Sequence, residues 1–578
     1  MKVSDYIAKY LACRGIRTVF ELPGGMTTHL LDSIHKLQKV EIVTMHHEQG
    51  AAFAADAAGR ITGLPGIAMA TSGPGATNLL TGIGSCYFDS SPAVFITGQV
   101  NRAEQKGKKN IRQLGFQETD IVAMAEPITK AAWKIDTAEE VPEILQRAFS
   151  LAVSGRPGPV LVDIPMDVQR ADIAIAEPSV DVEASPSSLQ FAPGNEVAYD
   201  DLFLAIQCAK KPLLLVGGGI RAGNALQALY QFIDLTGIPV VSSLMGIDLL
   251  PYAHPLRVGM IGSYGNRWAN LALAASDLLI VLGSRLDIRQ TGADTEFIKK
   301  NRTIYHIDCE IGELNNRITG CKTIHADLHT FLETAVKRYK AKDFHARTGW
   351  MNEINALRSQ HSDLEELSGI SGINPNAFMH QLSLHSQGAS AYVVDVGQHQ
   401  MWSAQSTEIL EGQRWMTSGG MGAMGFALPA GIGACIALER SPVVVVAGDG
   451  SFQCNIQELQ TVVRNKLPLK IVVMNNRCHG MVRQFQESYF HAQYQSTLWG
   501  YDTPDFARIA DAYGIPARRV DNNSETEAGL KFLWENPSMP ALLEVAIDTY
   551  TNTYPKIAFG RPLSEMEPDV KPIDMEGT

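Results

Sequence analysis

The stretch Gly448-Asp449-Gly450-Ser451-Phe452, with Asn475-Asn476 further along, decides the fold of this chain. It follows an apolar, β-branched run at 441–447 (SPVVVVA), which is typical of a strand buried on both faces. A helical pattern begins near Ile456, and a second apolar run at 470–474 ends at the asparagine pair. This order predicts a βαβ unit, in which parallel strands bring both polar loops to the same edge of the sheet.

These two polar loops predict a site for a metal ion and phosphate groups. Asp449 and Asn476 stand 27 residues apart and would meet at a helix N-terminus, where free backbone N–H groups attract phosphate. Carboxylate and amide oxygens suit Mg²⁺, which completes its shell with diphosphate oxygens and water. Because Gly-Asp-Gly alone is more often an ordinary strand-to-helix turn, the prediction depends on the asparagine pair.

The composition indicates an ordinary globular enzyme with small anionic ligands. At 578 residues the chain exceeds a single core, so we expect three domains. The net charge is −12 and the only basic cluster lies at 106–109, which argues against nucleic acid as a partner. The N-terminus lacks a signal-peptide pattern, and no apolar run approaches membrane-spanning length. The eight cysteines are scattered singly, as expected of a cytoplasmic protein.

Alternating strand and helix patterns predict an α/β protein with three doubly wound parallel sheets. The predicted domains are residues 1–175, 190–340 and 370–548, and a polar, turn-rich linker covers about 170–198. The first and third domains look like separate copies of one architecture. The tail, residues 549–578, is rich in proline, and we expect an irregular segment that is able to cover an active site.

Gly448-Asp449-Gly450 followed by a strand and Asn475-Asn476 resembles the diphosphate and metal motif of the thiamine-diphosphate enzymes. The resemblance assigns the Asp449 and Asn476 side chains and the Cys478 backbone carbonyl to Mg²⁺. It also implies that the three domains bind, in chain order, the cofactor's pyrimidine, FAD or a nucleotide, and the cofactor's diphosphate.

Glu48 lies between a predicted strand and the helical run Ala51-Ala52-Phe53-Ala54. By itself an acidic residue there is more often a helix cap or dipole partner. In the thiamine-diphosphate family, however, a glutamate in this setting bonds the aminopyrimidine ring and promotes loss of the thiazolium proton. The resemblance therefore implies that Glu48 is catalytic and reaches the cofactor across a dimer interface, since one subunit holds the pyrimidine and another the diphosphate.

Nearly the whole chain is similar to the acetohydroxyacid synthase (acetolactate synthase) branch of that family. The motifs that carry the similarity are Thr71-Ser-Gly-Pro-Gly-Ala-Thr-Asn78, Phe116-Gln-Glu118, Gly155-Arg-Pro-Gly158, Gly397-Gln-His-Gln-Met-Trp402 and Met424-Gly425. The resemblance implies that Met424 bends the cofactor and that Gly25 and Gln117 line the reaction centre. It further implies that the diphosphate meets Gly397, Gln398, His399, Gly450 and Ser451.

The middle domain carries the features of a flavin site. Gly217-Gly218-Gly219 follows a strand, although a lone glycine triplet is more often a tight turn. In the acetohydroxyacid synthase branch a charged segment grips FAD, and Arg285, Asp287 and Arg289 match its charged positions, with Arg156 reaching the same flavin. We expect FAD to be structural, because carboligation involves no net redox change.

Three residues are expected at the acceptor channel: Met166, Met481 and Phe485. Two of them, Met166 and Phe485, differ from the residues that are usual in this branch. Met166 replaces a lysine and Phe485 replaces a tryptophan, four residues after the methionine Met481. Losing a cation weakens recognition of a second carboxylate, and phenylalanine enlarges the channel. The acceptor therefore stays open between a second 2-oxo acid, which gives acetolactate, and a ketone such as a nucleotide-linked keto-deoxysugar.

We therefore expect a transferase that decarboxylates pyruvate and passes the acetyl (hydroxyethyl) unit to a carbonyl acceptor. It would act as a homodimer or homotetramer with its active site at the subunit interface. Two alternatives remain: a pyruvate oxidase or decarboxylase of the same superfamily, and a non-catalytic flavin-binding or nucleotide-binding relative.

Overall fold

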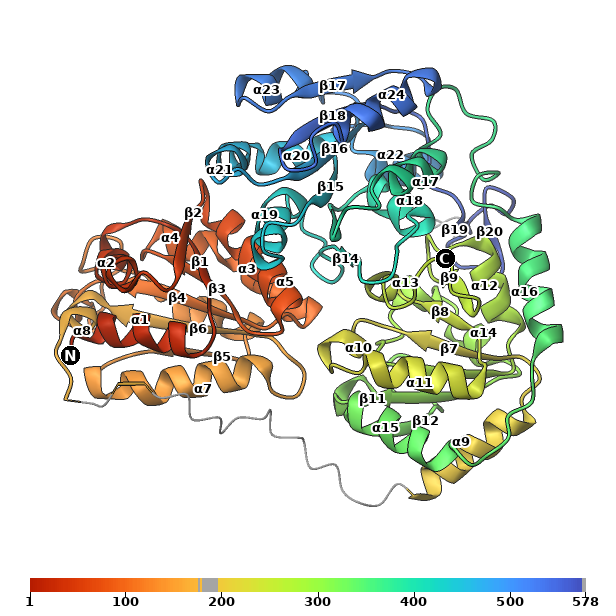
Figure 1. The fold of residues 1–578 in the computed structure, drawn as a ribbon, viewed down its shortest axis with the longest axis horizontal. Coiled ribbons are helices and arrows are strands. Elements are labelled where there is room, and N and C mark those ends of the chain that lie inside the picture. Colours follow the sequence, from red (N-terminus) through yellow and green to blue (C-terminus); the bar gives the residue numbers. More distant parts are fainter. Residues whose placement is uncertain (175–176, 179–195, 574–578) are drawn as a thin grey trace.

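The structure, a computed structural model, describes residues 1–174, 177–178 and 196–573. Within those residues three six-stranded parallel sheets follow one another along the chain, each between layers of helices (Figure 1). This confirms the predicted α/β class. The sheets lie inside the three predicted domains, whose boundaries stay predictions, and most of the predicted linker falls outside the described residues. No helix in the described ranges has the length and apolar character needed to cross a bilayer.

The first unit has the strand order β2-β1-β3-β4-β6-β5. Its central strands are buried and largely apolar, as the sequence predicted. The strands are β1 (Thr18–Leu22), β2 (Glu41–Thr44), β3 (Gly66–Ala70), β4 (Ala93–Gln99), β5 (Ala131–Lys134) and β6 (Pro159–Pro165). The helices are α1 (Val3–Cys13), α2 (Thr28–Leu37), α3 (Glu48–Thr62), α4 (Pro74–Asn78), α5 (Leu80–Asp89), α6 (Ile121–Ala125), α7 (Val141–Val153) and α8 (Met166–Arg170).

The middle unit has the order β12-β11-β10-β7-β8-β9, the arrangement of dinucleotide-binding folds. The strands are β7 (Pro212–Val216), β8 (Val240–Ser242), β9 (Arg257–Met260), β10 (Leu278–Leu282), β11 (Thr303–Asp308) and β12 (Lys322–His325). The helices are α9 (Glu196–Cys208), α10 (Gly219–Ala222), α11 (Leu226–Thr236), α12 (Arg267–Ala275), α13 (Ile288–Thr291), α14 (Thr295–Lys299) and α15 (Leu328–Tyr339), with α16 (Thr348–Gln360) in the connector that follows.

The third unit repeats the topology of the first, in the order β14-β13-β15-β16-β18-β17. The strands are β13 (Ala391–Val394), β14 (Arg414–Met416), β15 (Val443–Gly448), β16 (Leu469–Asn475), β17 (Ala517–Val520) and β18 (Ala541–Ala546). The helices are α17 (Pro375–His385), α18 (Gln398–Ser406), α19 (Ala427–Ala437), α20 (Asp449–Cys454), α21 (Leu459–Arg464), α22 (Gly480–Tyr489), α23 (Phe506–Ala512) and α24 (Asn523–Leu533).

The predicted βαβ unit is present as β15, α20, α21 and β16, but its helix begins earlier than predicted. It starts at Asp449, where the sequence pattern suggested Ile456. The backbone N–H of Gly448 donates to Ser451 Oγ (3.2 Å), which closes the first turn. The residues of that turn are too polar to show an apolar period, so the sequence pattern missed it. A 3₁₀ turn, Ile456–Glu458, then separates α20 from α21.

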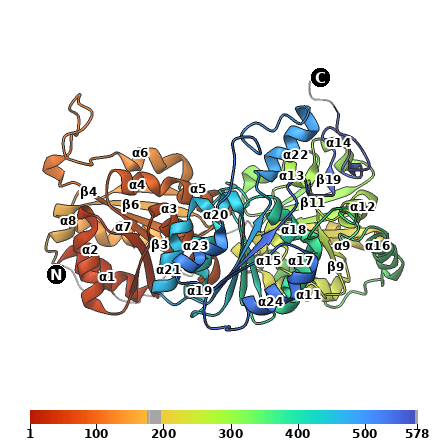
Figure 2. The same ribbon diagram turned by 90° about the horizontal axis from the view of Figure 1, so that it is seen from above.

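The first and third units pack directly on one another through α3 and α19 (Figures 1 and 2). Both helices are rich in alanine and glycine, so their backbones approach closely. A Cβ placed on Gly433 would lie 2.0 Å from the carbonyl oxygen of Ala54. The rings of Phe53 and Phe426 meet edge to face with centroids 5.3 Å apart. One apolar cluster therefore runs through both units.

The tail is more regular than predicted. Its strands β19 (Lys556–Ile557) and β20 (Met566–Glu567) form an antiparallel ribbon on the middle unit. The backbone N–H of Ile557 donates to the carbonyl oxygen of Ser263 (2.8 Å), and apolar ribbon side chains enter the core of that unit. The expectation of an irregular tail was therefore wrong for these residues.

The start of the tail runs along the third unit. Thr553 exchanges hydrogen bonds with the side chain of Gln484 on α22 (2.9 and 3.0 Å), and Gln398 Nε2 donates to the carbonyl oxygen of Thr551 (3.0 Å). These contacts place the beginning of the tail beside the residues predicted to meet the diphosphate.

Candidate active site

The candidate site of the third unit lies where the strand order reverses, between β13 and β15. In open parallel sheets, ligands bind beyond the carboxyl ends of the strands at such a point. The loop after β13 carries Gly397, β15 ends at Gly448, and α20 begins directly at Asp449. β16 lies next to β15 and ends at Asn475. The topology therefore brings the predicted phosphate and metal residues to one edge.

Asp449 is a buried carboxylate with one oxygen that lacks a protein partner. Its Oδ1 accepts the N–H of Gly450 (2.8 Å), whereas no hydrogen bond of the described residues reaches its buried Oδ2. Burial raises the pKa of Asp449 to about 7, although backbone N–H groups of Gly450, Arg477 and Cys478 oppose the shift. An orphaned carboxylate oxygen at this depth fits a cation ligand.

Asn476 is oriented by its neighbours. Its Nδ2 donates to Gln398 Oε1 (2.9 Å), which leaves Oδ1 facing the turn where the N–H of Cys478 approaches it (3.3 Å). Among the described residues no group of three or more His, Cys, Asp and Glu side chains is arranged to hold a metal. An ion at Asp449 would therefore depend on amide, backbone and ligand oxygens, which is the donor set that Mg²⁺ accepts.

Glycines keep the floor of this site open. A Cβ on Gly448 would lie 2.7 Å from Nδ1 of His399, and a Cβ on Gly450 would lie 2.8 Å from Cε1 of His479. His399 is buried, its Nε2 has no partner among the described residues, and burial lowers its pKa to about 3. A neutral imidazole with an unpartnered ring nitrogen, beside Gly448 at the start of α20, fits the oxygens of a bound phosphate.

The loop that carries Met424 is held by a carboxylate that the sequence analysis missed. Asp395, at the end of β13, accepts the N–H groups of Gly425 (3.0 Å) and Ala427 (2.8 Å). Burial raises the pKa of Asp395 to about 6. Met424 itself is 38% exposed, which suits a side chain that meets a ligand. The position of Asp395 directly after a buried strand was the available signal.

The catalytic residues predicted in the first unit gather around the turn at 71–78. Glu48 is buried at the N-terminus of α3, and its Oε2 accepts a hydrogen bond from Asn78 Nδ2 (2.9 Å). Gln117 packs against Gly73 and has a left-handed backbone with φ 66°, a conformation that is uncommon for non-glycine residues. A Cβ on Gly25 would meet nothing within 4 Å, so this glycine borders open space.

Within the described ranges Glu48 has no direct bond to the predicted metal ligands, although its neighbours His46 and Gln49 bond to the third unit within the chain. No hydrogen bond or ion pair of the described residues links Glu48 to Asp449, Asn476 or Cys478. Ser451 is buried, and its hydroxyl bonds to the backbone of Gly448. The approach of Glu48 to the diphosphate site across two subunits stays a prediction.

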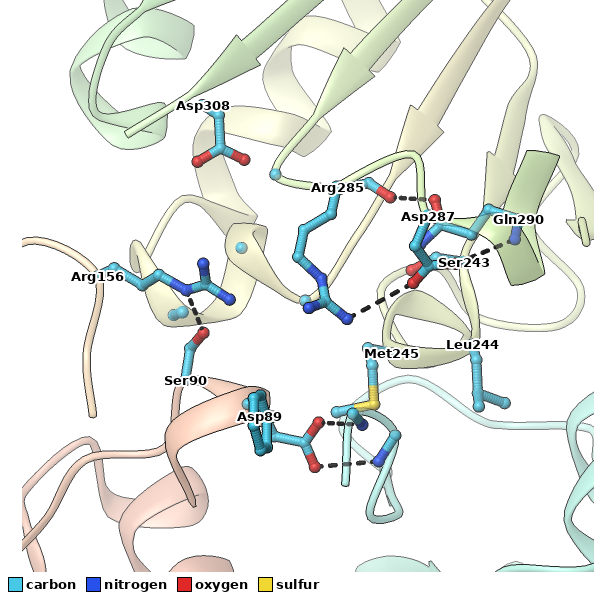
Figure 3. A pocket seen from close by; sticks show the side chains of 18 of the residues that line it. Asp89, Ser90, Arg156, Ser243, Leu244, Met245, Arg285, Asp287, Gln290 and Asp308 are labelled. Atoms are coloured by element: carbon cyan, nitrogen blue, oxygen red, sulfur yellow. Dashed lines mark hydrogen bonds and ion pairs between the residues drawn. The ribbon is translucent and has the colours of Figure 1, made fainter. Parts of the chain in front are cut away.

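A large pocket opens at the reversal point of the middle sheet, between β7 and β10, and Figure 3 shows it from close by. Residues of all three units line it, including Ser90 of the first and Gly419 of the third. Six of the predicted flavin residues line this pocket: Arg156, Gly218, Gly219, Arg285, Asp287 and Arg289. Gly217 lies outside the lining, because a Cβ there would meet the carbonyl oxygen of Gly283 at 2.2 Å; its role is close packing.

Charged groups stand on opposite sides of this pocket. Arg156 donates to Ser90 Oγ (2.8 Å) and pairs with Glu313, while Arg285 lies 3.5 Å from Asp287. Asp308 projects into the pocket in Figure 3, and burial raises its pKa. Guanidinium groups and carboxylates around one cavity fit a dinucleotide, which carries both phosphates and hydroxyls. The sequence analysis missed several lining residues: Ser243, Met245, Tyr264, Gln290, Asp308 and Asp327.

Comparison with known proteins agrees with this geometry. Residues 1–124 match the thiamine pyrophosphate enzyme N-terminal TPP binding domain, 200–335 the central domain and 395–545 the C-terminal TPP binding domain. The large subunit of acetolactate synthase isozyme 2 of Escherichia coli is 38% identical over 98% of this chain and 99% of its own.

The chloroplastic acetolactate synthase 2 of Nicotiana tabacum is 36% identical over 97% of this chain and 84% of its own. The acetolactate synthase large subunit of Lactococcus lactis is 34% identical over 97% and 95%. The chain belongs to the acetolactate synthase family of thiamine pyrophosphate enzymes. This confirms the resemblance and the enzyme class predicted from the sequence, since thiamine pyrophosphate is another name for thiamine diphosphate.

Within this acetolactate synthase-like enzyme, the predicted acceptor residues lie on two units. Met166 begins α8 of the first unit, and Met481 and Phe485 lie on α22 of the third. Phe485 is 41% exposed, and its ring centroid lies 4.7 Å from that of Tyr489. α22 thus presents an aromatic surface, and the meeting of Met166 with it stays a prediction.

Proposed function

We propose that this enzyme removes CO₂ from pyruvate and transfers the remaining two-carbon unit to a carbonyl acceptor, as expected of an acetolactate synthase. The observation that carries the proposal is the buried Asp449, which has one unpartnered oxygen and whose carboxylate receives the backbone N–H groups of Arg477 and Cys478, directly after Asn476. When bound, thiamine diphosphate supplies a nucleophilic carbon and accepts the electrons released by decarboxylation.

The residues of the third unit would hold the cofactor's diphosphate. Asp449, Asn476 and the Cys478 carbonyl would bind Mg²⁺, and this donor set suits a hard cation. Gly397, Gln398, His399, Gly450 and Ser451 would contact the phosphate oxygens. Support for this role comes from the glycine-lined floor and from the unpartnered ring nitrogen of His399.

Glu48 would handle the proton of the cofactor in a site built from two copies of the chain. Support for the proton role comes from the burial of Glu48 and from the hydrogen bond that Asn78 donates to it. Gly25 and Gln117 would border the same reaction centre. A homodimer or homotetramer is therefore part of the proposal, and the free state of all eight cysteines supports a reducing cytoplasm.

FAD would occupy the pocket of the middle unit in a structural role. Arg156 and Arg285 from two different units face this pocket, so a bound dinucleotide would tie the units together. Carboligation needs no net electron transfer, which is why we assign the flavin no redox step.

A ketone acceptor is the second candidate function. It is favoured by the apolar Met166 and the aromatic, partly exposed Phe485, because neither side chain can pair with a second carboxylate. Replacing Phe485 with tryptophan narrows the expected channel. We therefore expect F485W to lower the share of ketone-derived product relative to acetolactate.

Mass spectrometry of the products tests the proposal. The purified enzyme with thiamine diphosphate, Mg²⁺ and FAD receives pyruvate alone, and then pyruvate with a cyclic ketone. We expect CO₂ and acetolactate in the first reaction and a tertiary alcohol in the second if ketones are accepted. Acetolactate as the only product in both reactions removes the ketone acceptor. Acetate together with bleaching of the flavin would instead identify an oxidase.

A further inference from the structure

A buried carboxylate of the third unit holds the backbone that leads to Glu48. Glu458 ends the 3₁₀ turn after α20 and is 0% exposed. Its Oε1 accepts the N–H of His46 (2.9 Å), and the N–H of His47 also bonds to the carboxylate. Its Oε2 accepts the hydroxyl of Thr461 (2.7 Å). The carboxylate thus reaches from one unit to the strand-end loop of another.

The contact is shaped on the side of the first unit by Gly50. A Cβ at this position would lie 2.9 Å from Oε1 of Glu458, so only glycine leaves room for the carboxylate. Asn455 holds the other side of Glu48: its Nδ2 donates to Gln49 Oε1 (3.1 Å) and to the carbonyl oxygen of Gly425 (2.8 Å). The residues on both sides of Glu48 are therefore bound by the segment 455–458.

Packing alone does not explain a charged group at this depth. Burial raises the pKa of Glu458, and the hydrogen bonds from Thr461, His46 and His47 oppose that rise. A buried carboxylate costs stability unless its partners require it, and two of its partners lead directly into Glu48. The segment 449–458 begins at Asp449, the predicted metal ligand, and ends at Glu458, which binds the loop before Glu48. It therefore connects the two predicted points of contact with the cofactor.

We propose that Glu458 is a positioning residue. It fixes the loop before Glu48, so that the Glu48 carboxylate is correctly placed against the aminopyrimidine ring of the bound cofactor. Asn455 supports the same loop from the far side and links it to the loop that carries Met424. This inference rests on the proposed function, because it needs Glu48 to act on bound thiamine diphosphate.

The variant E458Q tests the proposal in the enzyme loaded with thiamine diphosphate and Mg²⁺. The neutral amide keeps only one acceptor oxygen and removes the negative charge to which the N–H groups of His46 and His47 bond. We expect the exchange of the cofactor's thiazolium C2 hydrogen, followed by acid quench and NMR, to slow about 10- to 100-fold, since small displacements of a reacting group have effects of this size. Cofactor affinity should change less than about threefold.

Two further measurements separate positioning from folding. Hydrogen–deuterium exchange of the cofactor-free protein should show faster exchange in E458Q at the amides of His46 and His47. The variant G50A moves the carboxylate without changing any charge, and we expect it to slow C2 exchange as well. The control is E366Q, which replaces a carboxylate whose side chain is 7% exposed and which bonds to Arg267 (2.6 and 2.8 Å) away from the site; it should lower thermal stability and leave C2 exchange unchanged.

The outcomes are distinguishable. C2 exchange at the wild-type rate in E458Q, with slow exchange in E48Q, would overturn the positioning role alone. Wild-type exchange in E48Q would overturn the proposed role of Glu48 and, with it, this inference. Equal slowing in E458Q and E366Q, at equal loss of thermal stability, would identify Glu458 as merely structural.

Discussion

The first and third units have the same strand order but carry different chemistry at equivalent places. In both sheets the strand order reverses between the first and third strands of the unit, and polar residues follow the strands at that point. In the third unit this edge holds the buried Asp449 with Asn476 and a floor of glycines, whereas the first unit offers a neutral turn and the carboxylate of Glu48. The shared topology decides where a ligand is bound, and the side chains decide which part of the ligand is bound.

The largest effect should come from a substitution at the predicted metal site of the third unit. D449A removes the predicted charged ligand of Mg²⁺, so we expect no detectable turnover and a loss of cofactor affinity of about 100-fold or more. The thermal stability of the cofactor-free protein should change little, because the substitution removes the unpartnered Oδ2 but also the acceptor of the Gly450 N–H. Titration with thiamine diphosphate and Mg²⁺, followed by fluorescence, measures the affinity.

The control for this prediction is D511A, which removes an exposed carboxylate on α23 of the same unit. It should bind the cofactor like the wild type. Normal Mg²⁺-dependent affinity in D449A would contradict the assignment of this edge as the metal site.

The matching change in the first unit is E48Q. A neutral amide keeps the shape of Glu48 and its contact with Asn78 but removes the base, so turnover should fall about 10²- to 10⁴-fold while cofactor affinity stays within a few-fold. Release of CO₂ from pyruvate measures the loss, and the variant should stay folded and yellow. E143Q, an exposed carboxylate on α7, is the matched control. Activity close to wild type in E48Q would refute the proton-handling role.

A substitution of Asp395 tests a feature that distinguishes the third unit from the first, namely the loop that carries Met424. In D395N an NH₂ group would oppose the backbone N–H of Gly425 or Ala427, which costs about 1–3 kcal/mol in a buried site. We expect a lower thermal midpoint and roughly tenfold slower turnover. Thermal scans and initial rates measure these effects, and an unchanged midpoint would show that the two hydrogen bonds do not hold the loop.

The smallest effect concerns the connector between the middle and third units. His380 of the third unit pairs with Asp363 of this connector. The ring nitrogens of His380 lie 2.7 Å from Glu408 and 2.9 Å from Asp363. Burial opposes the positive charge, but the two carboxylates outweigh burial and raise the pKa of His380 above 6.5. Burial likewise opposes the charge of Asp363, but the hydrogen bond and attraction from His380 lower its pKa below 3.8.

The sign of the pH dependence follows from these directions. The contribution of His380 is complete below pH 6.5 and is lost as the pH rises through its raised folded pKa. The contribution of Asp363 is complete above pH 3.8 and is lost as the pH falls through its lowered folded pKa. H380Q should therefore reduce the free energy of unfolding more at pH 6 than at pH 9, by roughly 1–2 kcal/mol. Thermal scans at the two pH values measure this, and an equal effect at both would contradict the ion pairs.

The buried parts of the fold were predictable from the sequence, and the edges were not. Strands such as β10 and β15 are continuous apolar runs, which a short window detects. β5, β12 and β17 are short edge strands with mixed or exposed side chains, so their pattern matches that of loops. Their pairing depends on neighbours far along the chain.

The residues of the site also fall into a predictable and an unpredictable group. Asp449 and Asn476 were predictable because each directly follows a recognisable strand. Asp395, Asn78 and Glu458 act through contacts with backbone or side chains that are remote in the sequence or unremarkable in composition. Asp395 left one signal in the sequence, its position directly after a buried strand, whereas the contacts of Asn78 and Glu458 become visible only when the chain is folded.

The tight crossing of α3 and α19 limits how this molecule can move. With no space even for a methyl group between Gly433 and Ala54, the first and third units form one block without a hinge between them. We therefore expect substrate entry and product departure to depend on peripheral segments, such as the chain around the exposed Tyr550 or the stretch around Phe116, which is 81% exposed. The flexing of these segments would then limit turnover, while the central block stays rigid.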